Sequence, residues 1–186
     1  GHGVGSALMS VSAMNVLRAQ SLKNVNFLKP RSVLNAINNV FLMEDHGNKF
    51  FTLWYGVYDK KNRQLTYSSA GHPPAYIINS NTLEKVNIES LHTPNIAIGY
   101  MKDFDYKESM VTLNKYSKLY VFSDGVFEVE KQNKDMLSLE EFEKHMGNFI
   151  DPTVMESSKI LGSMKAFNDT TQAFVDDYSF LEIIFR

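Results

Sequence analysis

The sequence predicts an α+β protein in which helices come first and antiparallel strands follow. Through the first forty residues, apolar side chains recur every three or four positions, which is the period of an α-helix. From residue 50 onward, short runs rich in aromatic and β-branched residues alternate with polar turns, as in antiparallel sheets. A chain that opens with helices and continues mainly with antiparallel strands is compatible with the α+β class.

Two helices are expected near the start of the chain. The second begins at Pro30, whose missing amide hydrogen costs nothing in a first turn, and continues to Phe41. Further on, residues 139–149 have a helical pattern, and Asp151-Pro152 predicts the cap and first-turn proline of another helix. The first helix covers residues 4–20, with one apolar face that we expect in the core: Val4, Ala7, Leu8, Val11, Met14 and Leu17.

Strands are expected where aromatic and β-branched residues dominate. Residues 50–58 and 64–69 flank a polar turn and predict an antiparallel hairpin. The next strand, 75–78, follows a Gly-His-Pro-Pro loop, and we expect it to extend the same sheet as a meander. Residues 118–122 are almost continuously apolar, which predicts a strand that is buried on both faces. Two more strands are expected at 106–113 and 178–185.

The composition indicates one domain over residues 1–186. Its 44% apolar content is enough for one sizeable core. The net charge of −2 gives no positive field for nucleic acid or anionic lipid, so we expect neither as a partner. Because the chain has no cysteine, it has no disulfide framework, and the cytoplasm is the simplest location. No run approaches the ~18 apolar residues of a membrane span.

Two carboxylate sites stand out because each lies at the end of an expected strand. Asp124 directly follows residues 119–122, and Asp176-Asp177 directly precedes the closing strand. Mg²⁺ and Mn²⁺ prefer oxygen ligands and keep several waters, so a few carboxylates on neighbouring strand ends suffice for a site. The same residue types also form ordinary polar turns, and from spacing alone the turn is the commoner interpretation.

Other reactive residue types give weaker patterns. The five histidines have no metal-ligand spacing, which predicts surface or loop positions and no zinc site. Ser6, Ser10 and Ser123 lie outside any Gly-x-Ser-x-Gly elbow, which argues against a serine hydrolase. Residues 1–5 are similar to a phosphate-binding glycine loop but lack the lysine of a P-loop.

Four blocks of sequence, in this order, resemble the signature of one family. That family is the PPM-type metal-dependent protein phosphatases, in their bacterial branch similar to sporulation stage II protein E. The likeness runs from the first residue nearly to the last. The four blocks are Gly1-His2-Gly3-Val4-Gly5-Ser6-Ala7-Leu8-Met9, Ala70-Gly71-His72-Pro73-Pro74, Ser123-Asp124-Gly125-Val126-Phe127-Glu128 and Asp176-Asp177-Tyr178-Ser179.

The resemblance implies a four-layer αββα sandwich of two antiparallel sheets flanked by helices, with a site for two Mn²⁺ or Mg²⁺ ions. It also implies that residues 1–186 are a single PPM-type phosphatase domain truncated at its N-terminal side. The N-terminal strands would then be missing, together with a bridging aspartate expected three positions before Gly1. Activity of this piece alone is left open.

The resemblance also implies the site residues and the reaction. Asp124 and Asp176 match the family's metal-binding aspartates, and we expect both to be catalytic and to bind metal. Asp177 is a further candidate ligand, with a supporting role beside Asp176 left open, and Glu128 is a less secure one. The expected reaction is hydrolysis of phosphoserine or phosphothreonine on a regulatory protein such as an anti-sigma antagonist.

Two alternatives and the expected partners complete the prediction. A catalytically inactive phosphatase-like module that binds a signalling partner is the main alternative, and an aspartate upstream of Gly1 would favour the enzyme instead. A metal-dependent hydrolase on another fold would require a different strand order. The resemblance implies a phosphorylated protein substrate and a sensor or regulatory region upstream, and it leaves a homodimer open.

Overall fold

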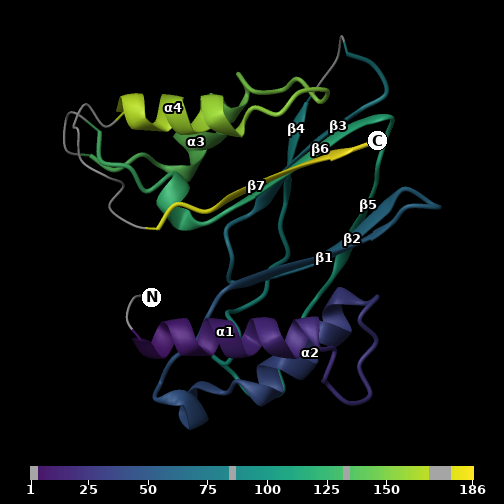
Figure 1. Ribbon diagram of the computed structural model, residues 1–186, viewed down its shortest axis with the longest axis vertical. Helices are drawn as coiled ribbons and strands as arrows, with labels where there is room; N and C mark the ends of the chain where they lie inside the picture. Colours follow the sequence, from purple (N-terminus) through teal and green to yellow (C-terminus); the bar gives the residue numbers. More distant parts are fainter. Residues whose placement is uncertain (1–3, 84–86, 132–134, 168–176) are drawn as a thin grey trace. The chain divides into compact units, whose positions relative to one another are not determined.

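The computed structural model describes residues 4–83, 87–131, 135–167 and 177–186 (Figure 1). The chain forms two compact units, and within these described ranges each has one antiparallel sheet and two α-helices. The predicted α+β class with two antiparallel sheets and helices is therefore confirmed. One domain over residues 1–186 stays a prediction. Unit 1 contains Gly1–His72 and His92–Thr112, and unit 2 contains Pro73–Leu91 and Leu113–Arg186.

Unit 1 carries a three-stranded sheet in the order β1-β2-β5. The predicted hairpin is confirmed, with Leu53 opposite Ala70 and Asp59 opposite Gln64. The Asp59 carboxylate accepts hydrogen bonds from the backbone of the turn that joins the two strands, as a short polar turn requires. The elements of the unit are α1 (Val4–Arg18), α2 (Pro30–Val40), the 3₁₀ helix η1 (Met43–His46), β1 (Leu53–Asp59), β2 (Gln64–Ala70) and β5 (Ser109–Thr112).

The first helix forms as predicted, but a different face of it is buried. Met9 and Ala13 pack into the core of unit 1 with residues of α2. Leu8, Val11 and Met14, which we expected in that core, are 63%, 57% and 48% exposed. Because α1 has apolar residues on more than one side, its spacing predicts a helix without deciding which side packs against α2.

Unit 2 carries a four-stranded sheet in the order β4-β3-β6-β7. The central strand β6 is buried along most of its length, as predicted. Among the described residues, no helix of either unit is long and apolar enough to cross a membrane. The elements of unit 2 are β3 (Ala75–Ser80), β4 (Ile88–Leu91), β6 (Tyr116–Phe122), the 3₁₀ helix η2 (Asp124–Val126), α3 (Leu139–Met146), α4 (Ser157–Phe167) and β7 (Phe180–Phe185).

The prediction that residues 75–78 extend the hairpin sheet as a meander was wrong. These residues belong to β3, which pairs with β4 and β6 in the other sheet. The chain leaves the first sheet at Gly71, which has a positive φ of 62° and donates its N–H to the Asn95 carbonyl instead of to a strand. Pro73 and Pro74 then offer no N–H groups with which a ladder could continue.

Two other elements begin later than predicted, because side chains bind the backbone there. No helix starts at Asp151, whose carboxylate accepts bonds from the backbone and hydroxyl of Thr153 and closes a turn, so α4 begins at Ser157. The strand expected from residue 106 begins at Ser109. The Tyr106 amide donates to the Asn35 side chain, and the next amide donates to the Asn95 side chain.

A buried charged cluster ties α4 to the sheet of unit 2. The Lys118 ammonium lies 2.8 Å from the Glu156 carboxylate and 3.3 Å from that of Glu182, and the Lys118 side chain is 0% exposed. The Glu182 carboxylate also accepts the backbone N–H groups of Glu156 and Ser157, at the start of α4. Strands β6 and β7 therefore hold the first turn of this helix through side chains.

Candidate metal centre

The end of β6 and the beginning of β7 lie side by side in unit 2 (Figure 1). The two strands are antiparallel neighbours, with Phe122 opposite Phe180. Asp124 comes two residues after Phe122, and Asp177 comes three residues before Phe180. Strand pairing therefore brings two of the predicted carboxylate residues, far apart in sequence, to the same edge of one sheet.

The Ser123 hydroxyl joins the two segments beyond this last strand pair. Ser123 Oγ donates to the Asp177 carbonyl oxygen at 2.9 Å and accepts the Ser179 N–H at 3.0 Å. The Ser123 N–H donates to the Ser179 carbonyl oxygen at 3.0 Å. These three hydrogen bonds fix the backbone beside Asp124 to the backbone of Asp177.

Asp124 is the first residue of the short helix η2. The helix fixes the Asp124 backbone, while the Asp124 side chain faces solvent. The Asp124 carbonyl oxygen accepts the N–H groups of Phe127 and Glu128 at 3.0 and 2.9 Å. Val126 is fully buried in the core of unit 2 and anchors the turn. The Asp124 carboxylate accepts the Gly125 N–H at 3.1 Å, so the carboxylate is oriented and yet accessible.

The neighbour of Asp177 anchors its segment on the other side. The Tyr178 ring is half-buried, packs against the core of unit 2 and stacks on Phe180 with 6.3 Å between ring centroids. Burial raises the pKa of Tyr178 to about 12, so the phenol stays protonated at neutral pH. Asp177 itself is exposed.

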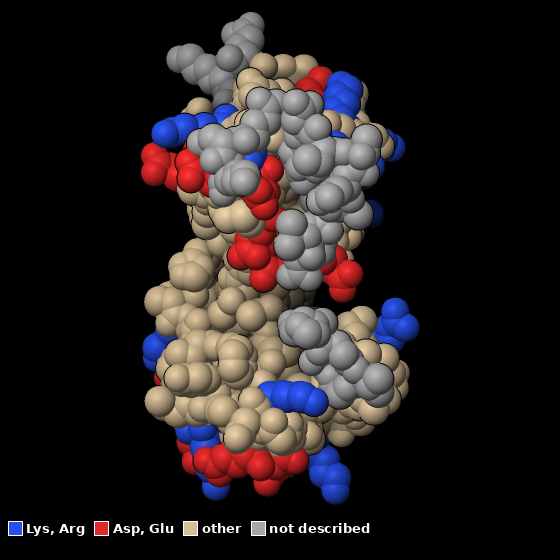
Figure 2. All heavy atoms as spheres, turned by 90° about the vertical axis from the view of Figure 1, so that its left-hand side faces the viewer, with Lys and Arg blue, Asp and Glu red and all other residues tan. Residues whose placement is uncertain are grey.

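Acidic side chains gather on one face of the unit that contains α3 and α4 (Figure 2). Asp124, Glu128 and Asp177 are exposed acidic residues of this unit. Within the described parts of the chain, no lysine or arginine forms an ion pair with Asp124 or Glu128. An excess of carboxylate that protein cations do not neutralise attracts metal cations and repels phosphate.

The chemistry of these donors fits a hard divalent cation that keeps part of its water shell. Carboxylate oxygens are the ligands that Mg²⁺ and Mn²⁺ prefer, and Mg²⁺ commonly binds through one or two of them. Asp176 lies outside the described residues, as do Gly1, His2 and Gly3 of the first block. Among the residues described, no group of three or more His, Cys, Asp or Glu side chains could hold a metal ion. Metal binding by Asp124, Asp176 and Asp177 stays a prediction.

The Gly71 block belongs to a buried polar network in unit 1, which the sequence did not reveal. The Asn95 side chain donates to the carbonyl oxygens of Ser69 and Lys107 and accepts the Lys107 N–H. A carbon at the Cβ position of Gly71 would lie 3.0 Å from Ala97. The network therefore holds the loop after residue 92 against β2. The one signal in the sequence was a polar residue on either side of Pro94.

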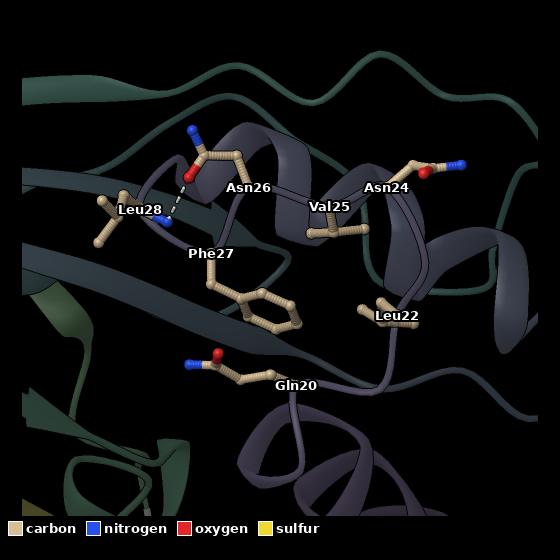
Figure 3. A pocket seen from close by; sticks show the side chains of 7 residues that line it. All are labelled: Gln20, Leu22, Asn24, Val25, Asn26, Phe27 and Leu28. Carbon is tan, nitrogen blue, oxygen red and sulfur yellow. Dashed lines mark hydrogen bonds between the residues drawn. The ribbon is translucent and has the colours of Figure 1, made fainter.

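A separate hollow of about 690 Å³ lies in unit 1, in the connection between α1 and α2 (Figure 3). Its lining contains amide and apolar side chains and no acid or base, so it offers no side chain for proton transfer. The Asn26 side chain is used locally, as acceptor of the Leu28 N–H at 2.9 Å. The lining residues are Gln20, Leu22, Asn24, Val25, Asn26, Phe27 and Leu28.

Comparison with known proteins adds family and fold to this geometry. The family model for stage II sporulation protein E (SpoIIE) matches residues 1–185. Phosphoserine phosphatase RsbU of Bacillus subtilis is 30% identical over 106 residues, which are 57% of this chain and 31% of RsbU. The match thus spans less than a third of that relative's length.

Solved structures show the same fold. The SiaA-PP2C domain of Pseudomonas aeruginosa superposes with a TM-score of 0.77 at 18% identity, over 100% of this chain and 72% of that one. RsbX, solved in complex with magnesium, superposes with a TM-score of 0.63 at 16% identity, over 98% of this chain and 75% of that one. At such identities the likeness shows the architecture, in agreement with the predicted sandwich class.

Proposed function

Because this chain belongs to the SpoIIE family, we propose that it is the catalytic region of a Mn²⁺- or Mg²⁺-dependent protein phosphatase. Its substrate would carry phosphoserine or phosphothreonine on a regulatory protein such as an anti-sigma antagonist. The observation that carries the proposal is the pairing of β6 with β7, which brings Asp124 and Asp177 to one edge of a sheet. The match to a relative named phosphoserine phosphatase supports the reaction class.

Asp124 and Asp176 would hold the metal, with Asp177 as a further ligand or as support for Asp176. When bound, the ions lower the pKa of a water molecule to make a nucleophile and neutralise charge on the phosphoryl group. The protein's part is to hold the carboxylates on strand ends that are fixed by their pairing. Substitution of a metal-binding aspartate should lower the rate of hydrolysis far more than the stability of the fold, so such variants should fold normally.

Exposure of the site suits a substrate that is itself a protein. Asp124 and Asp177 are exposed at the edge of the sheet, where a phosphorylated side chain on another protein can reach them. The exposed carboxylates of Asp124, Glu128 and Asp177 repel a phosphate dianion when no cation is bound. Substrate binding, and not hydrolysis alone, should therefore depend on the metal.

The test measures phosphate released from a phosphoserine-containing protein by the full-length natural polypeptide, with and without Mn²⁺. Asp124→Asn is expected to reduce turnover by about 10²-fold or more, because it removes charge stabilisation at the reacting phosphate. Asp45→Asn is the matched control, since Asp45 is an exposed aspartate of η1 in unit 1. Equal turnover by the two variants would remove Asp124 from the proposed site.

The inactive binding module is the second candidate, and the aspartate expected upstream of Gly1 decides between the two. It predicts a well-folded full-length protein that releases no phosphate at saturating Mn²⁺ but still binds a partner protein. An aspartate three positions before Gly1 in the parent sequence favours the enzyme, and its absence favours the module.

The regulatory setting follows from the resemblance and belongs to the same proposal. The single phosphatase domain would lie in the cytoplasm, downstream of a sensor or regulatory region in the same polypeptide. Turnover by the full-length protein and by a version without its upstream region should then differ. Equal rates would argue against control by that region.

A further inference from the structure

We infer that Ser123 is a positioning residue of the proposed metal site. Its hydroxyl sets the spacing between the segment that contains Asp124 and the segment that contains Asp177, so that both can bind the same cation. The inference rests on the proposed function and adds to it a residue that touches neither metal nor substrate.

The hydroxyl uses both of its hydrogen-bonding capacities across the gap between the segments. As donor it binds the Asp177 carbonyl oxygen at 2.9 Å, and as acceptor it binds the Ser179 N–H at 3.0 Å. These two partners lie on either side of Tyr178, so one side chain holds the backbone at both points. Because the donor bond ends on Asp177 itself, it fixes the backbone of a candidate ligand.

Ser123 lies at a helix N-cap, where a serine side chain usually accepts a hydrogen bond from the helix backbone. It is the N-cap residue of η2, with extended φ and ψ of −76° and 163°, yet its side chain makes no capping bond to that helix. Serine is favoured at N-caps because its oxygen accepts an N–H from the first turn. Here the hydroxyl binds the segment before β7 instead, which indicates that joining the two segments is its role.

The rest of the connection would survive loss of the hydroxyl. The Ser123 N–H still donates to the Ser179 carbonyl oxygen, and six residue pairs join β6 to β7. Tyr178 still packs against the core. The effect of removing the hydroxyl should therefore fall on the position of Asp177 relative to Asp124 more than on folding.

Three substitutions separate these effects. Ser123→Ala removes both side-chain bonds, whereas Ser123→Thr keeps the hydroxyl on an extended backbone that accepts a β-branched residue. Ser179→Ala is the matched control, because Ser179 lies on the same segment, is exposed, and takes part in these bonds through its backbone.

The experiment measures Mn²⁺ affinity of the full-length protein by titration calorimetry, with thermal unfolding in the absence of metal and turnover as a function of Mn²⁺. Ser123→Ala is expected to weaken Mn²⁺ binding about tenfold, as for other residues that orient metal ligands. Ser123→Thr and Ser179→Ala should stay within about twofold of the wild type. Excess Mn²⁺ should restore most of the maximal turnover of Ser123→Ala, because the ligands themselves remain.

The outcomes distinguish this inference from the proposed function. Equal Mn²⁺ affinity in Ser123→Ala and Ser179→Ala, with an active wild type, overturns the role of Ser123 and leaves the phosphatase standing. A folded wild type that binds no Mn²⁺ overturns both. If Ser123→Ala melts below the assay temperature, Ser123→Cys replaces it, since a thiol has similar size but bonds weakly, and the same outcomes apply.

Discussion

Replacing Lys118 with methionine should destabilise unit 2 strongly, because the buried ammonium makes two hydrogen bonds and lies between two carboxylates. It donates to the Val154 carbonyl oxygen at 3.2 Å and to Glu156 at 2.8 Å, and it lies 3.3 Å from Glu182. Its side chain is 0% exposed, and those of Glu156 and Glu182 are 7% and 1% exposed. Methionine would leave two carboxylates buried without a cation, which typically costs about 3–5 kcal/mol.

Urea denaturation of the wild type and variants measures this cost. Lys144→Met is the matched control, because Lys144 pairs with Glu140 on the surface of α3 with its side chain 73% exposed, and its loss should leave the free energy of unfolding nearly unchanged. Adding Glu156→Gln to Lys118→Met should recover part of the loss, because one uncompensated charge disappears. A loss below about 1 kcal/mol for Lys118→Met would refute the reasoning, because the carboxylates would then be solvated without the cation.

Two further predictions concern local strain and protonation. Gly71→Ala should lower the free energy of unfolding in urea denaturation by more than Gly47→Ala does. Both glycines have a positive φ, near 62° for Gly71 and 64° for Gly47. A Cβ at Gly71 would lie 3.0 Å from Ala97, whereas a Cβ at Gly47 would have nothing within 4 Å. About 1 kcal/mol is expected from the backbone conformation alone, and equal losses would show that the contact with Ala97 relaxes freely. Burial lowers the pKa of the His145 imidazole below its ordinary value of 6.5. As the pH falls, this imidazole therefore takes up a proton in the unfolded chain before it does so in the folded protein, and stability falls as the pH drops through 6.5. His145→Gln should flatten the pH dependence of urea denaturation between pH 7 and 5, and an unchanged slope would contradict this assignment.

Local patterns predicted most elements, and contacts between distant residues decided what the patterns missed. The hairpin of β1 and β2 and the buried strand β6 follow from periodicity and a polar turn, which are properties of neighbouring residues. The sheet to which β3 belongs depends on partners far along the chain. Asp151 shows a local failure, because the side chain that can cap a helix closed a turn with Thr153 instead.

In the candidate site, too, local patterns predicted the residues, and contacts between distant residues determined how they lie together. Asp124 and Asp177 could be selected from the sequence because each lies at a strand end and fits a family block. Their common location required the antiparallel pairing of β6 with β7, which no local pattern specifies. The role of Ser123 was out of reach for the same reason, since its hydroxyl acts on residues more than fifty positions away.

Strand β6 supports both the stability of unit 2 and the spacing of the candidate ligands, and it does so at two different points. At Lys118 it binds Glu182 of β7 and Glu156 before α4, inside the core. Beyond its end, Ser123 binds the backbone of Asp177 near solvent. Loss of the first contact destabilises the whole unit, because buried charges are left unpaired. Loss of the second should leave the core intact and free only the segment of a candidate ligand, so Ser123→Ala is expected to separate metal affinity from stability where Lys118→Met cannot.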